Sequence, residues 1–455
     1  MAMKPLTTVG TMHFDNQLNI PPLADSTVDA EGTRVFSLTA ETGTSSFLPE
    51  VTTETWGYNG AFLGPTLRAQ RGEKVRVEIQ NNLPAPTTVH WHGMHIPAVY
   101  DGGAHQIIES GASWQPEWVI DQPAATLWYH PHVHGTSEEQ MTRGLSGMFI
   151  VAEQGTTAGL PSEYGVDDIP VILQDRTIAK NGSFKLTSDA TAGLLGDTIL
   201  INGTANPYLE VGTEAVRLRI LNAATARVFN FAFSDNRAFA VVGSDGGLLR
   251  APANVDRLLL SPGERAEIVV RMNPGEEVVL QSQPQELGMS DALTTRTGGN
   301  DTLDLLKLRA GTTLTASAEL PSNLAAESSF EMEKPMITRG FILKDMYING
   351  QLMGMSRIDQ SVSAQSVETW SISNTDNLAH NFHVHGAQFQ ILDIDGRAPA
   401  PEFAGWKDTV FLPVRTSARV HIKFGKYKDR KNPYMYHCHF IRHADMGMMG
   451  QYTIV

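Results

Sequence analysis

The stretch near the C-terminus that reads YHCHFIRHADMGMM, residues 436–449, concentrates side chains that can bind metals or carry electrons. It contains Cys438, the only cysteine among the 455 residues, and histidines stand directly on both sides of it. His443 follows five residues later, and three methionines come after it. A lone cysteine is by itself an ordinary small apolar core residue. The stretch therefore has chemical meaning only if other parts of the chain supply further donors.

Ten of the fifteen histidines fall into four groups, and no histidine occurs between His134 and His380. One H-x-H pair alone is weak evidence, because an isolated buried histidine is usually a hydrogen-bonded core residue. Four such pairs in two matched sets are hard to explain by packing, because clustered buried imidazoles are costly without metal or hydrogen-bond partners. The groups are His90 and His92; His130 and His132; His380, His383 and His385; and His437, His439 and His443.

The H-x-H spacing has a structural reason. On a β-strand, residues i and i+2 point to the same face, so each pair directs two imidazoles into one cavity. Four pairs supply eight imidazoles, which is too many for one metal ion and enough for a metal cluster. Imidazole binds copper, zinc, iron and nickel alike, so the pairs alone do not identify the metal.

Cys438 indicates copper. Within residues 437–439 the cysteine faces away from its two neighbours, so it belongs to a second site on the opposite side of the same strand. Its expected partners are His380, which is outside the H-x-H phase, and His443. Two histidines, a thiolate and a weak axial methionine form a blue-copper electron-transfer site. Met448 is the best axial candidate, ahead of the alternatives Met446 and Met449.

The two sites are joined by one tripeptide. A blue copper accepts electrons singly, and the segment from Cys438 to His437 and His439 can carry them to the cluster of paired imidazoles. A four-electron acceptor such as dioxygen matches that arrangement.

Strands must position these donors, because short apolar segments that alternate with polar residues recur along the chain. Turn residues separate the segments, and long helical periodicity is scarce, as expected for β-sandwiches or barrels. The clearest segments are Lys74 to Gln80, Val216 to Leu221, Ala266 to Arg271, Val367 to Ile372 and Arg419 to Lys423.

An internal repeat relates the two ends of the chain. VHWHG at 89–93 parallels FHVHG at 382–386, and WYHPH at 128–132 parallels MYHCH at 435–439. The first and last domains therefore look like copies of one β-sandwich. A prior of roughly 150 residues per domain gives three domains. Polar stretches place them at residues 1–155, 156–325 and 326–455.

The composition of the chain excludes some classes of binding partner. A formal net charge of −14 argues against a nucleic-acid surface, and no segment has the length of a membrane span. The N-terminus, MAMKPLTTVG, lacks the features of a signal peptide. We therefore expect small-molecule partners, no nucleic acid and no membrane span.

With these four histidine motifs, the chain resembles the multicopper oxidases, the family of laccases, cuprous oxidases, bilirubin oxidases and ascorbate oxidase. The resemblance implies an all-β fold of three cupredoxin-like Greek-key domains and four coppers per chain, with a copper-free middle domain. It assigns His380, Cys438, His443 and Met448 to type 1 copper. It assigns His90 and His383 to type 2 copper, and His92, His130, His132, His385, His437 and His439 to the type 3 pair.

Further details resemble the bacterial laccase and cuprous oxidase branch, namely TWGYNG at 55–60, DGG at 101–103, DQPAAT at 121–126 and GWKDTV at 405–410. By that likeness, Asp101 lies near the trinuclear cluster and helps to deliver protons. Asp376, four residues before His380, would hold the ring of that histidine in orientation.

Two departures from that branch are visible. Cuprous oxidases carry a methionine-rich insertion over the type 1 site, whereas the corresponding stretch, about residues 285–345, contains only the scattered Met289, Met332 and Met336. This predicts an open type 1 site that organic reductants can approach. The acidic residue expected directly after the last type 1 histidine is Ala444, which puts one proton route in doubt.

The resemblance implies a laccase-type oxidase that takes electrons from phenols or aromatic amines and reduces dioxygen to water. The alternatives are a cuprous oxidase that uses Cu(I) in copper detoxification, and a copper-binding or structural cupredoxin-repeat protein without turnover. Family likeness further implies a monomer in the periplasm or secreted medium, with a cytoplasmic location as the alternative.

Overall fold

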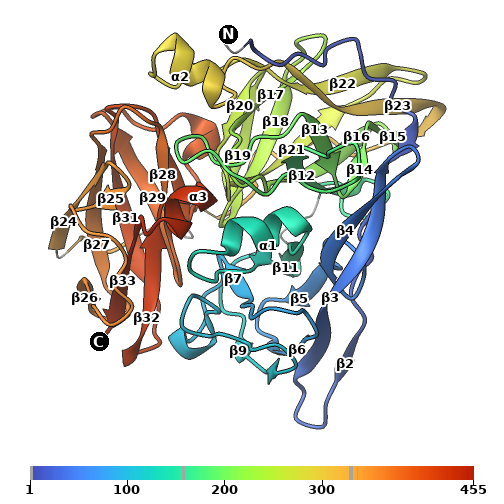
Figure 1. Ribbon diagram of the computed structural model, residues 1–455. Coiled ribbons are helices and arrows are strands. Elements are labelled where there is room, and N and C mark those ends of the chain that lie inside the picture. The colour runs from blue at the N-terminus through green and yellow to red at the C-terminus, as the bar shows by residue number, and fades with distance from the viewer. Residues whose placement is uncertain (1–3, 156–158, 327–331, 336) are drawn as a thin grey trace.

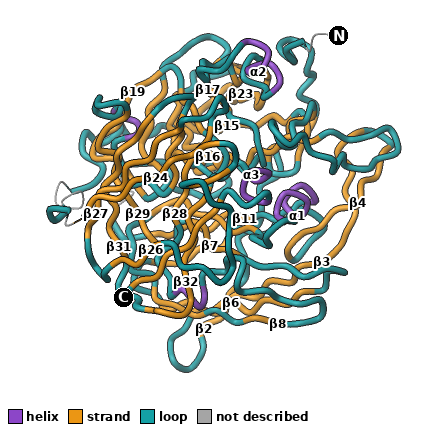
Figure 2. The backbone as a smooth tube through the Cα atoms, turned by 60° about the vertical axis from the view of Figure 1, so that its left-hand side comes forward, coloured by secondary structure: helices purple, strands orange, loops and turns teal. Residues whose placement is uncertain are grey.

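The structure is a computed structural model that describes residues 4–155, 159–326, 332–335 and 337–455. Strands arranged in six sheets dominate the described residues, and the few helices there are short (Figure 2). The prediction of an all-β fold is confirmed. No helix in the described ranges is both long and apolar enough to cross a membrane.

Two sheets form the first region of the chain. One has the order β5-β11-β10-β7 and the other β2-β3-β6-β8, with β4 paired to β3 and β9 paired to β6. The strands are β2 (Ser26–Val28), β3 (Arg34–Leu48), β4 (Val51–Tyr58), β5 (Leu67–Gln70), β6 (Lys74–Asn81), β7 (His90–His92), β8 (Ser113–Trp114), β9 (Glu117–Val119), β10 (Ala125–His130) and β11 (Gly147–Ala152), and the helices are η1 (Ala98–Tyr100) and α1 (Ser137–Arg143).

Two larger sheets form the middle region, in the orders β14-β13-β12-β16-β21-β18-β19 and β1-β15-β23-β22-β17-β20. The N-terminal β1 (Asn16–Gln17) joins the second of these by pairing in parallel with β15. The others are β12 (Asp168–Arg176), β13 (Thr198–Ile201), β14 (Thr204–Ala205), β15 (Pro207–Thr213), β16 (Ala215–Asn222), β17 (Phe229–Phe233), β18 (Phe239–Ser244), β19 (Gly247–Val255), β20 (Leu258–Leu260), β21 (Arg265–Arg271), β22 (Glu277–Ser282), β23 (Leu303–Thr315) and the helix α2 (Asp291–Arg296).

The last region again has two sheets, in the orders β25-β24-β27-β31-β29 and β26-β33-β32-β28-β30. They contain β24 (Ile337–Lys344), β25 (Tyr347–Ile348), β26 (Gln360–Val362), β27 (Val367–Asn374), β28 (His380–Val384), β29 (Ala387–Ile394), β30 (Thr409–Leu412), β31 (Ser417–Phe424), β32 (Asp429–His437) and β33 (Met449–Ile454), with the helices η3 (Pro401–Phe403) and α3 (Ile441–Asp445).

The period-2 segments named from the sequence all lie within strands. In β6 the apolar residues at 75, 77 and 79 are buried, and the residues between them are partly exposed, as alternation requires. Three large clusters of buried apolar side chains fill the regions, each supplied mainly by one of them. Burial of this apolar surface is the main favourable contribution to folding.

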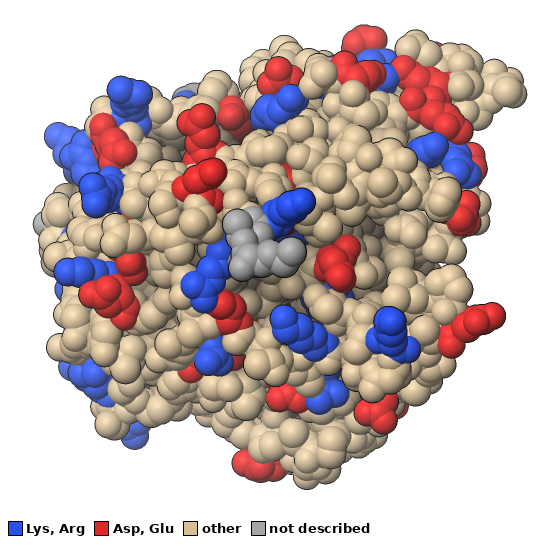
Figure 3. Space-filling view, turned by 45° about the horizontal axis from the view of Figure 1, so that its top comes forward, with Lys and Arg blue, Asp and Glu red and all other residues tan. Residues whose placement is uncertain are grey.

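The repeat seen in the sequence has a counterpart in strand pairing. In the first region β7 pairs antiparallel with β10, which sets His90 opposite His130. In the last region β28 pairs antiparallel with β32, which sets His383 opposite His437. The two helices that follow these strand pairs, α1 and α3, lie side by side where the regions meet (Figure 1). On the face in Figure 3, acidic and basic side chains are interspersed.

Candidate metal centre

Eight imidazoles from the first and last regions meet in one buried cluster. None of these side chains belongs to a residue that is more than 4% exposed. Rings from the two regions alternate, because His90 stacks on His385 and His92 stacks on His383, each with centroids 3.7 Å apart. The cluster consists of His90, His92, His130, His132, His383, His385, His437 and His439.

Ring nitrogens of different histidines approach one another closely. Nε2 of His437 lies 3.0 Å from Nε2 of His132 and 3.0 Å from Nε2 of His385. Three sets of three ring nitrogens lie within 4.8 Å of one another. These sets are His90, His92 and His130; His90, His383 and His385; and His132, His385 and His437. Such spacing would be unfavourable for charged rings.

The outward nitrogens of six rings donate to oxygen, which leaves the inward nitrogen of each with a free lone pair. The pairs are His90 Nδ1 to the Asp101 carbonyl, His92 Nε2 to Asp408 Oδ1, His130 Nδ1 to the Pro131 carbonyl, His383 Nδ1 to the Asp408 carbonyl, His385 Nδ1 to Asp101 Oδ2, and His437 Nδ1 to the Cys438 carbonyl.

The cluster fits metal ions. Nε2 of His90, Nε2 of His383 and both ring nitrogens of His439 are buried without a hydrogen-bond partner among the described residues. Burial and the neighbouring imidazoles hold the pKa of His90 and His439 well below the ordinary histidine value. Neutral imidazole is the form that binds metals, and metal coordination would satisfy nitrogens that are otherwise costly to bury.

A second donor group surrounds Cys438. Its Sγ lies 3.6 Å from His380 Nδ1 and 3.5 Å from His443 Nδ1, and these two nitrogens are 3.2 Å apart. Burial alone would raise the pKa of the thiol, but hydrogen bonds with the two histidines lower it to about 6. The group therefore offers a thiolate and two ring nitrogens, a soft donor set that suits copper.

The axial alternatives differ in their surroundings. Met448 is fully buried in the same apolar cluster as Cys438, and its carbonyl accepts the Cys438 N–H at 3.2 Å. Met449 packs in another cluster with Met435, and Met446 is 37% exposed. These positions favour Met448.

The strand argument for the H-x-H pairs needs a correction. Only His90 and His92 lie together within one strand, because β10 ends at His130, β28 at Val384 and β32 at His437. The paired rings nevertheless converge. Beyond β32, the Asn381 carboxamide holds the chain in place, since its Oδ1 accepts the His439 N–H at 2.6 Å. Sequence reasoning missed Asn381, although it stands inside the HNFH motif.

Asp101 lies against the cluster, as the resemblance implied. Its Oδ2 accepts from His385 Nδ1 at 2.8 Å, while its Oδ1 is buried 3.6 Å from His90 Nδ1 with no hydrogen-bond partner in the described part of the chain. Burial raises the pKa of Asp101 well above the ordinary aspartate value.

Asp408 is a second buried carboxylate at the cluster, and sequence reasoning missed it. Its Oδ1 accepts from His92 Nε2 at 2.9 Å, and Arg265 of β21 donates to both of its oxygens at 2.8 and 2.7 Å. Burial would raise its pKa, but Arg265 above all holds it well below the ordinary value. In the sequence, the segment GWKDTV that contains it shows a likeness to one branch but no sign of this contact.

Asp376 contacts the second donor group. Its Oδ2 accepts from His380 Nε2 at 3.1 Å. Burial opposes ionisation, yet the hydrogen bond and charge of His380 lower the pKa of Asp376 to about 2. The carboxylate fixes the ring so that Nδ1 faces Cys438.

His443 is covered, so the expectation of an open site is wrong. The residue is 2% exposed, and its Nε2 donates to the Thr191 carbonyl at 3.2 Å. The cavity beside it holds only about 10 Å³ and is lined in part by Met289. Thr191 and Ala192 of the covering residues 188–194 line this cavity together with Leu287, Met289 and Thr297 of residues 285–345. Met332 is not among the residues that line this cavity, and Met336 lies outside the described residues.

Ala444 is buried, and the residue that follows it, Asp445, is acidic. Asp445 accepts the backbone N–H groups of Gly135, Ser137 and Glu138. Burial raises the pKa of Asp445. It ties the loop after His132 to the helix that contains His443.

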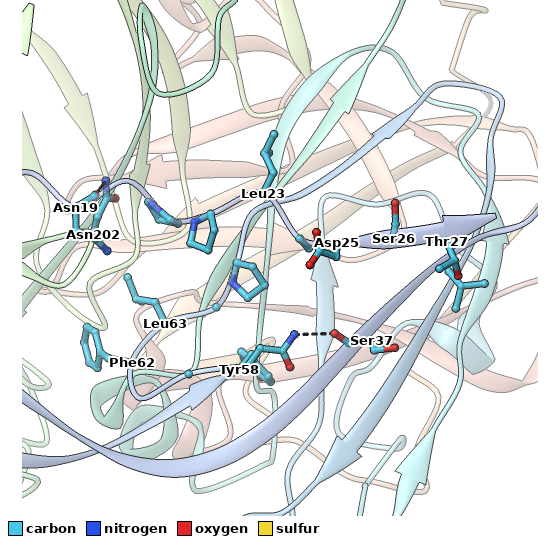
Figure 4. A pocket seen from close by; sticks show the side chains of 18 residues that line it. Asn19, Leu23, Asp25, Ser26, Thr27, Ser37, Tyr58, Phe62, Leu63 and Asn202 are labelled. Atoms are coloured by element: carbon cyan, nitrogen blue, oxygen red, sulfur yellow. Dashed lines mark hydrogen bonds between the residues drawn. The ribbon is translucent and has the colours of Figure 1, made fainter.

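A cavity of about 600 Å³ lies elsewhere, between the N-terminal segment and the first region (Figure 4). Its lining includes Tyr58, Asn59 and Asn202, and Asn59 Nδ2 donates to the Ser37 carbonyl at 2.7 Å. No histidine or cysteine lines this cavity, so it is separate from both donor groups.

Comparisons with known proteins agree along most of the chain. Three family profiles described as multicopper oxidase match residues 39–156, 167–287 and 321–455. The chain is 34% identical over 450 residues to the multicopper oxidase mco of Staphylococcus haemolyticus, covering 96% of this chain and 92% of that one.

Two other similar proteins have names that indicate different functions. The cell division protein FtsP of Xenorhabdus nematophila is 34% identical over 450 residues, covering 96% of this chain and 92% of that one. The crystal structure of a laccase from Pediococcus acidilactici superposes with a TM-score of 0.87 at 34% identity, covering 97% of this chain and 94% of that one.

Proposed function

Because the chain belongs to the multicopper oxidase family, we propose that it is a laccase-type oxidase that takes electrons singly from phenols or aromatic amines and reduces dioxygen to water. One observation carries the proposal. Cys438 faces His380 and His443, while its two chain neighbours, His437 and His439, face the imidazole cluster. A single tripeptide thus joins a one-electron site to a multinuclear one.

The proposed occupancy is four coppers per chain. When bound, copper supplies one-electron acceptance at the thiolate site and dioxygen reduction at the cluster. The thiolate site would use His380, Cys438, His443 and Met448. The type 2 site would use His90 and His383, and the type 3 pair would use His92, His130, His132, His385, His437 and His439.

The chain's own residues prepare both sites. Asp376 and the Asp101 and Asp408 oxygens orient the rings through the nitrogens that do not face the donor groups. Cys438 provides a short covalent path to His437 and His439 through the backbone. Asp101 is the proposed proton-handling carboxylate, supported by its buried Oδ1 beside the cluster, which has no hydrogen-bond partner among the described residues.

The cover over His443 favours a second candidate, a cuprous oxidase. A cavity of about 10 Å³ cannot hold a phenol ring, whereas an ion such as Cu(I) needs little room. Met289 lines that cavity and offers a soft thioether, which suits Cu(I). A phenol would have to donate its electron across the cover or displace it.

Oxygen uptake by the copper-loaded protein separates these functions. We expect uptake with 2,6-dimethoxyphenol and a blue thiolate-to-copper absorption. Uptake with Cu(I) alone would overturn the laccase assignment in favour of the cuprous oxidase. Uptake with neither reductant would support a copper-binding or structural role, as the name of the FtsP relative suggests for that protein.

Three further features are part of the proposal. The domains are taken as residues 1–155, 156–325 and 326–455, with the middle one free of copper. We infer a monomer that acts outside the cytoplasm, on the strength of the family likeness.

A further inference from the structure

A cavity of about 370 Å³ lies between the first and last regions, away from both donor groups. The first region contributes Arg71, His95 and Asp121 to its wall. Residues of β29 and β31 and the loops after them form most of the rest. None of the twelve proposed copper ligands lines this cavity. Its volume falls within the roughly 300–1,000 Å³ that small-molecule sites occupy.

Two polar groups project into the cavity from neighbouring strands. Gln388 of β29 and Lys423 of β31 are directly opposite each other in the antiparallel register, so their side chains leave the sheet on the same face. Gln388 is 3% exposed, and its Nε2 is buried with no hydrogen-bond partner in the described ranges. A buried N–H donor without an acceptor is costly, so the amide is suited to a ligand oxygen.

Lys423 supplies a positive charge that pairs with no carboxylate of the described residues. Among the described residues no ion pair involves it, whereas Lys426 pairs with Asp121 at 2.6 Å and Arg71 pairs with Glu153 at 2.8 Å. The only acid in the lining, Asp121, is thus already matched. An anion entering the cavity would meet one free cation and little repulsion.

The remaining wall is aromatic. Trp406, Phe424 and Tyr427 line the same cavity. Flat rings favour offset or edge contacts with another ring. The cavity thus combines an ammonium and an amide donor, neither of them paired within the part of the chain that the structure describes, with several ring surfaces.

We propose that this cavity binds a small aromatic carboxylate. The carboxylate oxygens accept from the Lys423 ammonium and from Gln388 Nε2, and the ring packs against Trp406 and Tyr427. The site is independent of the oxidase function proposed above, because it shares no residue with the copper ligands.

Calorimetric titration of the copper-loaded protein with benzoate tests the proposal. Benzoate is chosen because it cannot donate electrons as a phenol does. We expect a Kd in the range of roughly 10 µM to 1 mM, given the few atoms available for contact. Benzyl alcohol keeps the ring without the charge, and we expect it to bind at least about tenfold more weakly.

Two variants locate the binding. Lys423→Gln should weaken benzoate binding about tenfold, and Gln388→Leu should weaken it severalfold. Lys431→Gln, which alters an exposed lysine outside the cavity, should leave the Kd unchanged. An unchanged Kd in Lys423→Gln, or equal binding of benzyl alcohol, would overturn the proposal. Lys423 is exposed in its strand, so that variant is expected to fold even if Gln388→Leu does not.

Discussion

The first and last regions use one strand arrangement for different numbers of donors. In each, two adjacent antiparallel strands contain at least the first histidine of the H-x-H pairs that enter the shared cluster. Three residues before the first pair, the last region has His380 and the first has Thr87. Between the histidines of the second pair, the last region has Cys438 and the first has Pro131.

The position that contributes a histidine to the thiolate site in the last region holds, in the first region, a threonine that makes a neutral hydrogen bond. Thr87 Oγ1 donates to Oε1 of Gln140, from α1, at 2.7 Å. In the last region His380 instead faces His443, from α3, at 3.2 Å between ring nitrogens. Sheet pairing therefore fixes the imidazole cluster in both regions, whereas the second donor group depends on a few individual side chains.

Breaking the thiolate site should have the largest effect. Cys438→Ser replaces a soft thiolate with a hydroxyl, so we expect loss of the blue absorption of the copper-loaded protein. Turnover should fall by more than roughly a hundredfold, beyond the range typical of changes to residues behind the ligands. Absorption spectra and oxygen uptake provide the measurements. Thr87→Val, the counterpart change in the first region, should leave the absorption unchanged, and an unchanged spectrum in Cys438→Ser would refute the assignment.

Asp408→Asn should have the next largest effect, and it acts on the cluster that the two regions share. The change removes the nearer of the two buried carboxylates that pair with Arg265 and leaves only Asp245, 3.8 Å away, at a cost of about 3 kcal/mol of unfolding free energy. It also weakens the hold on His92, so oxygen uptake should fall by roughly 10- to 100-fold. Chemical denaturation and oxygen uptake would measure the two effects. A stable variant with full activity would show that Asp408 is not needed at the cluster.

Asp101→Asn tests whether Asp101 and Asp408 differ in how much each stabilises the protein. No cation pairs with Asp101 in the described structure, and burial already favours its neutral form. The isosteric amide should therefore cost less than about 1 kcal/mol of stability, while oxygen uptake falls about tenfold. The blue absorption should stay intact, because Asp101 does not contact Cys438, His380 or His443. A stability loss equal to that of Asp408→Asn would contradict this account.

The sequence predicted those parts of the molecule that repeat or alternate. Strand positions follow from period-2 patterning, and the cluster follows from matched H-x-H pairs. Asp408 and Thr191 were not predictable in this way, because each acts on a histidine that is 316 or 252 residues away in the chain. A single polar residue in a loop has no periodicity, and its tertiary partner is decided only by how the regions pack. The same limit explains why the cover over His443 was missed.

Loosening the cover over His443 should have the smallest effect. It tests whether residues 188–194 restrict which reductants reach the thiolate site, a site that only the last region has. The cover is tied down by Arg296 of α2, which pairs with Asp189 at 2.5 Å, and by Glu138, whose Oε1 accepts the Leu194 N–H at 3.1 Å. An exposed ion pair of this kind stabilises by up to about 1 kcal/mol, so Arg296→Ala should raise kcat/KM for a bulky phenol by at most about fivefold. The value for Cu(I) should not change, since a small ion needs no opening. Arg271→Ala removes another exposed ion pair of the middle region, with Glu319, and serves as the control. If both variants raised phenol turnover equally, general loosening would explain the result, and residues 188–194 would not set the size of the reductant.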